Sequence, residues 1–149
     1  EWSLKIITEE GRYLDSDTVS ARDWFKKILK GNSMENSRKF AEFIAGVLDD
    51  KQGRDIVIMD IAEKSSFADY FVIATGSSER LINALAEYVE DKSAAHGRFV
   101  RSIEGRNGTG WVLMDYGDVV VNVFSEENRQ KYNLEKIWSD CEIINWEAE

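Results

Sequence analysis

The residues best suited to chemistry are four carboxylates at the ends of apolar runs: Asp69, Glu104, Asp115 and Asp118. Such acids are most often solvated turn formers. In this chain, aromatic side chains stand next to them, and aromatics ringed by charge are typical of a protein–protein hot spot. A tryptophan in a strand can equally pack in the core, so both interpretations stay open. The second one predicts a partner-binding set that consists of Asp69, Tyr70, Trp111, Asp115, Tyr116 and Asp118.

A Gly-Ser-Ser turn at residues 76–78 offers a second kind of chemistry, because free N–H groups at a helix N-terminus bind phosphates. A nucleotidyltransferase opens a helix in this way and then needs paired carboxylates on the next strand to hold two metal ions about 4 Å apart. The next run, 99–104, carries one acid, and Asp115 and Asp118 are three apart on a turn. Helix capping by the serines explains the turn adequately. A nucleotide-binding or nucleotidyl-transferring enzyme is therefore the alternative hypothesis.

Nucleophilic and metal chemistry lack partners in this sequence. The single histidine, His96, follows two alanines and precedes Gly97, which predicts a helix C-cap and not a catalytic base. Cys141 has no second cysteine for an internal disulfide and no second histidine to activate it. We predict that it is a half-buried apolar residue. We predict no catalytic residue, no metal and no cofactor.

Charge separates the two parts of this 149-residue chain. Residues 1–33 hold six acidic and six basic side chains, so the rest carries the whole net charge of −9. Phosphate backbones repel an acidic domain, which disfavours direct nucleic-acid binding, whereas basic surfaces attract it. The charge can also serve solubility alone. We find no signal peptide and no apolar run near the roughly 20 residues of a membrane span, so we expect a cytoplasmic protein.

The periodicity of apolar residues predicts one compact domain, residues 34–149, after an extension of uncertain origin, residues 1–33. In the extension we expect a short helix, a turn near Gly11, and a second helix that stops at 31–33. In the domain the order α-β-β-α-β-β-β-α predicts an α/β fold with a mixed five-stranded sheet flanked by helices. The predicted ranges are helix 35–50, strands 55–61 and 68–76, helix 79–95, strands 99–104, 110–115 and 118–124, and helix 126–139.

Two features of strand pairing follow. Strands 68–76 and 99–104 should lie parallel, because a helix joins them. For the last hairpin we expect a type I turn with Gly117 in a bulge, since Tyr116 disfavours positive φ. This register puts Trp111 and Leu113 on one face with the odd-numbered residues of 118–124. It leaves Asp115, Tyr116 and Asp118 exposed together at the tip.

Three motifs of the compact domain together resemble the ribosomal silencing factor family, also called the Iojap-related family. They are ADYFVIATGSS at 68–78, GWVLMDYGDVVVNVF at 110–124, and the R-x-x-Y-x-L-E-x-x-W pattern at 129–138. The resemblance covers roughly residues 36–140. One position departs from it, because the family usually has histidine where this chain has Asn122. Asparagine does not titrate, which argues against an acid–base role there.

The resemblance implies a fold shaped like the nucleotidyltransferases but without their catalytic acids, and a homodimer. It also implies binding to a large-subunit ribosomal protein, protein fourteen, at the face where the small subunit joins. Such binding blocks subunit association and represses translation when nutrients are limiting. Ribosomal proteins are basic, so the acidic charge of the domain fits this partner independently.

Overall fold

The computed structural model describes residues 6–7, 13–14 and 21–146 except 107. Two compact units divide the chain, Glu1–Asn36 and Ser37–Glu149, and each is described by itself. None of the described helices is long and apolar enough to cross a membrane.

The first unit contains a pair of short strands. Strands β1 (Ile6–Ile7) and β2 (Tyr13–Leu14) pair antiparallel, so the short helix predicted before Gly11 is wrong. Isoleucine and tyrosine favour strands, and this preference outweighs the weak helical pattern. Helix α1 (Ala21–Asp50) is one helix, which makes the predicted stop at 31–33 wrong as well. A single glycine costs a helix only about 1 kcal/mol relative to alanine, and no proline follows to end it.

The second unit is built on a six-stranded sheet in the order β5-β6-β7-β4-β3-β8. Its strands are β3 (Arg54–Asp60), β4 (Tyr70–Thr75), β5 (Ser102–Glu104), β6 (Trp111–Asp115), β7 (Val119–Phe124) and β8 (Glu142–Ile144). The prediction of five strands missed β8, which pairs antiparallel with β3. Three residues are too short for a periodicity to register, so only the pairing defines this strand.

The parallel pair of the sheet is β4 and β7. Strands β4 and β5 do point the same way, as predicted, but β7 and β6 lie between them, each antiparallel to the next strand toward the β5 edge. All six residues of β4 and all six of β7 are buried. A strand covered on both faces is expected to be this uniformly apolar.

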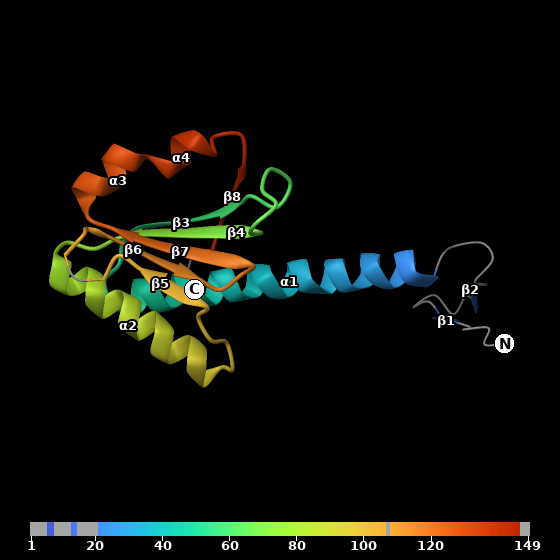
Figure 1. Ribbon diagram of the computed structural model, residues 1–149. Helices are drawn as coiled ribbons and strands as arrows, with labels where there is room; N and C mark the ends of the chain where they lie inside the picture. Colours follow the sequence, from blue (N-terminus) through green and yellow to red (C-terminus); the bar gives the residue numbers. More distant parts are fainter. Residues whose placement is uncertain (1–5, 8–12, 15–20, 107, 147–149) are drawn as a thin grey trace. The chain divides into compact units, whose positions relative to one another are not determined.

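Helices cover the two faces of the sheet unequally. Helix α2 (Glu79–Ala95) and the Ser37–Asp50 part of α1 lie on one face, which we call the helix-packed face. The short helices α3 (Glu126–Tyr132) and α4 (Leu134–Ile137) lie on the other (Figure 1). Ile44, Leu85 and Val121 belong to the core of the helix-packed face. Phe71 and Phe124 belong to the smaller core on the other side.

The last predicted helix, 126–139, is two helices, α3 (Glu126–Tyr132) and α4 (Leu134–Ile137). Asn133, with φ of 43°, adopts a left-handed conformation that asparagine tolerates well, and it ends α3. Leu134 and Trp138 pack on the sheet. Tyr132 is 41% exposed and Ile137 65% exposed, so neither is a core residue. The break at Asn133 changes the phase of the apolar face.

Candidate functional site

The turn between β6 and β7 decides which side chains can form a site. The Tyr116 amide donates to the Val119 carbonyl oxygen (2.9 Å), so the two loop residues are Gly117 and Asp118. Gly117 has φ of 91°, and its amide donates to Asp115 Oδ1 (2.7 Å). Glycine at the first loop position is typical of a type II′ hairpin. The predicted type I turn with Gly117 in a bulge is therefore wrong: the loop has two residues and no bulge, so the pairing of the two strands differs from the prediction by one residue.

This single step reverses the predicted faces of the hairpin. Trp111 pairs with Phe124, and Leu113 pairs with Asn122. They thus share a face with the even-numbered residues of β7 and not with Val121, because a shift of one residue turns every side chain over. Asp115, opposite Val120, lies on the face of Trp111.

Both tyrosines of the predicted set are core residues, which contradicts the expected exposure of Tyr116. Tyr70 is 4% and Tyr116 5% exposed. The hydroxyl groups of Tyr116 and Ser93 lie 2.6 Å apart, and the Tyr116 ring packs edge-on against Phe40. Burial raises the pKa of both phenols. Neither ring offers surface to a partner.

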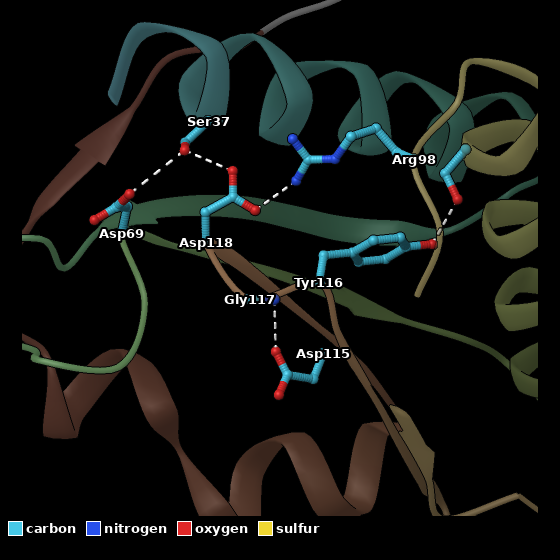
Figure 2. Close-up of polar contacts among 8 residues, drawn as sticks. Ser37, Asp69, Arg98, Asp115, Tyr116, Gly117 and Asp118 are labelled. Carbon is cyan, nitrogen blue, oxygen red and sulfur yellow. Dashed lines mark hydrogen bonds and ion pairs between the residues drawn. The ribbon is translucent and has the colours of Figure 1, made fainter. Parts of the chain in front are cut away.

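Asp118 and Asp69 turn toward helix α1 on the helix-packed side (Figure 2). The Ser37 hydroxyl donates to Asp118 Oδ2 at 2.6 Å and approaches Asp69 Oδ2 at 3.4 Å. The Arg98 guanidinium donates to Asp118 Oδ1 at 2.5 Å. Both oxygens of Asp118 therefore have partners within the fold, and its carboxylate fastens the hairpin to α1.

Asp115 points to the opposite side of the sheet (Figure 2). On that side of the sheet lies a group of side chains that are half-buried or exposed, and we call it the Trp111 patch. Glu104 of β5 pairs with Leu113 across the strands and shares its face. The patch consists of Glu104, Trp111, Leu113, Asp115 and Tyr132.

Contacts beneath the patch hold Trp111 in place. Its indole Nε1 donates to Asn122 Oδ1 (3.0 Å), and its ring lies against those of Phe124 and Tyr132, with centroids 5.0 and 4.6 Å away. Asn122 is 1% exposed, and its Nδ2 has no hydrogen-bond partner among the described residues. Buried and hydrogen-bonded, Asn122 positions the tryptophan.

A pocket of about 260 Å³ opens in the Trp111 patch. Its lining is aromatic, aliphatic and acidic, and comprises Glu104, Gly105, Thr109, Trp111, Leu113 and Tyr132. The predicted set contained only Trp111 of these residues. The pairing of Glu104 with Leu113 depends on the register between β5 and β6. The exposure of Tyr132 depends on the helix end at Asn133, and asparagine, which tolerates the left-handed conformation, is the sequence signal that could have marked it.

The remaining candidates have structural roles. Ser78 Oγ accepts from the Leu81 amide and caps α2, and His96 is the C-cap of that helix, as predicted. Cys141 is half-buried, as predicted. Over the described part of the chain, no three His, Cys, Asp or Glu residues gather to hold a metal ion.

Comparison with known proteins gives consistent matches. The family model described as "Ribosomal silencing factor during starvation" matches residues 34–149. The ribosomal silencing factor of Bacillus subtilis is 39% identical over 110 residues, which cover 74% of this chain and 93% of that protein. The mouse protein named "Mitochondrial assembly of ribosomal large subunit protein 1" is 28% identical over 66% of this chain and 44% of its own length.

A crystal structure of a Chromobacterium violaceum protein superposes with a TM-score of 0.67 at 33% identity. The match covers 68% of this chain and 85% of that one.

Proposed function

Because this chain belongs to the ribosomal silencing factor family, we propose that it binds the large ribosomal subunit through a basic ribosomal protein, protein fourteen. By occupying the subunit-joining face, it blocks association of the small subunit and represses translation when nutrients are limiting. The observation that carries the proposal is the family match over residues 34–149. The names of the relatives point to ribosome regulation and to the large subunit, and none names an enzyme. With this role the protein acts in the cytoplasm, and from the family resemblance we propose that it forms a homodimer.

The Trp111 patch is the docking surface that fits a basic protein best. It combines an anchored indole with an exposed phenol and carries the carboxylates of Glu104 and Asp115. Aromatic residues are enriched at interface centres, and complementary charge speeds association. The chain's charge of −9 steers it toward a basic surface.

The other residues of the predicted set contribute to docking indirectly, by supporting the elements that carry the patch. Asp69 and Asp118 accept from the Ser37 hydroxyl, and Asp118 also pairs with Arg98, so both support the end of the sheet beside the patch. Tyr70 and Tyr116 support the hairpin from the core.

Co-sedimentation with purified large subunits tests the proposal. Asp115→Lys is expected to weaken binding at least about tenfold, because it turns an attraction into a repulsion. Trp111→Ala should cost upwards of about 2 kcal/mol if the indole is a hot spot. Asp115→Asn keeps an acceptor for the Gly117 amide and should weaken binding less than the lysine does. Glu87→Lys, the same reversal at an exposed position on α2, should bind like the wild type.

Circular dichroism first establishes that each variant is folded. If folded Asp115→Lys and Trp111→Ala both sediment with large subunits as well as wild type, the docking surface is elsewhere. The second half of the proposal needs light scattering during subunit joining. If the wild-type protein binds large subunits but does not slow this joining, the proposed binding stands and the proposed block of subunit association is refuted.

A further inference from the structure

We propose that the pocket in the Trp111 patch receives one arginine side chain of the basic partner. The proposal rests on the function proposed above, and it assigns the chemistry of the group that the pocket takes. Three features of the pocket carry it: its size, its walls and its unbalanced charge.

Size limits the occupant to something small. Pockets for cofactors and drug-sized ligands usually measure about 300–1,000 Å³. This one is about 260 Å³, so it suits a single long side chain.

The walls suit the methylene stem and the flat cationic head of an arginine. Leu113 and the rings of Trp111 and Tyr132 supply apolar surface, and Tyr132 already attracts an ammonium group, the Lys131 Nζ 5.6 Å from its ring centroid. Backbone carbonyls add hydrogen-bond acceptors: the Thr109 hydroxyl oxygen lies 2.5 Å from the Gly105 carbonyl oxygen and 2.9 Å from that of Trp111, and its single proton serves one of them at a time. A carbonyl oxygen has two lone pairs, so each can accept a second donor.

Charge selects a cation. Glu104 is the one ionised side chain among the residues that line the pocket. Within the described part of the chain no salt bridge engages it, whereas Glu90 on the other side of the nearby loop is paired with Arg106. A carboxylate at the rim of an apolar pocket, whose lining residues include no lysine or arginine, matches a guanidinium. Arginine fits better than lysine, because its planar fork bonds a carboxylate with two parallel N–H groups and packs flat against rings.

The experiment titrates the full chain with N-acetyl-arginine methylamide and follows the Trp111 indole N–H signal by nitrogen–proton NMR. Trp111→Phe assigns that signal. The citrulline analogue, which is uncharged but of the same shape, and the lysine analogue are titrated in parallel. We expect a saturating shift with a Kd of about 1–30 mM for the arginine probe, and a weaker response to the other two. Glu104→Gln should raise the Kd at least about fivefold, and Glu87→Gln, an exposed acid on α2, should leave it unchanged.

Several results would overturn the proposal. They are no shift of the Trp111 signal up to about 100 mM arginine probe, an equal response to the citrulline probe, or an equal affinity for the lysine probe. The outcome is separable from the proposed function. If large subunits bind but the arginine probe does not, only the assignment of the pocket is refuted. If the arginine probe binds but large subunits do not, only the ribosomal role is refuted.

Discussion

Strand β6 presents two different surfaces with alternate residues. Val112 and Met114 point into the helix-packed face and are 1% and 0% exposed. Leu113 and Trp111, on the other face, are only half-buried, although both pack against the smaller core on that side. Residues of similar hydrophobicity thus fill a core or form a docking surface, depending on which side of one strand they occupy.

The acids beside this strand differ in the same way. The Asp118 carboxylate accepts hydrogen bonds from Ser37 and Arg98, so its charge is neutralised by a partner within the fold. Asp115 binds only a turn amide, and Glu104 has no ion pair among the described residues. The comparison shows that a carboxylate near an aromatic ring is a candidate for binding a partner only where no lysine or arginine of the same chain already pairs with it.

The largest expected effect sharpens the contrast between Met114 and Leu113. Met114→Ala removes a fully buried side chain and should lower the free energy of unfolding by about 2–5 kcal/mol. Leu113→Ala removes a half-buried one and should cost less, but it should weaken large-subunit binding. Urea denaturation and co-sedimentation measure the two quantities. Equal losses of stability would mean that the two faces of β6 are equally packed.

A smaller effect is expected at the Tyr116 hydroxyl. Tyr116→Phe removes its hydrogen bond with Ser93 and should lower the free energy of unfolding by about 0.5–1.5 kcal/mol at neutral pH. Large-subunit binding by the folded variant should not change, because the ring is buried. Binding that falls while folding is intact would assign Tyr116 to the interface after all.

The same residue gives a pH dependence. Burial raises the pKa of Tyr116 above the value near 10 that it has when unfolded, so folding favours the neutral phenol. This contribution is fully present below pH 10 and is lost as the pH rises through the folded pKa. Wild type should therefore lose more stability than Tyr116→Phe between pH 9 and 11, as urea titrations at each pH will show.

The smallest effect is expected from removal of residues 1–33. The family match begins at residue 34, and the charge of the removed part is balanced. A chain that starts at Met34 should unfold at the same urea concentration as the full chain and bind large subunits equally well. A lower midpoint would show that the extension supports the compact unit.

Sequence alone determined the class of the fold and the family, because both depend on local patterns. The apolar period of α2, the β-branched runs of β4 and β7, and the serine cap at Ser78 each act within a few residues. The family motifs are likewise contiguous in the chain. A short strand such as β8 left no such pattern and needed its partner β3 to exist.

Only the tertiary structure decided which residues form the site. Tyr116 and Trp111 are both aromatic residues in or beside β6, yet one is core and the other is half-buried. The choice depends on the loop Gly117-Asp118, since a loop longer or shorter by one residue shifts the pairing by one and turns the side chains of one strand over relative to the other. Local preference at two loop positions is worth little energy. Burial of Val112, Met114 and Tyr116 against α1 and α2 is worth far more, and that packing fixed the register.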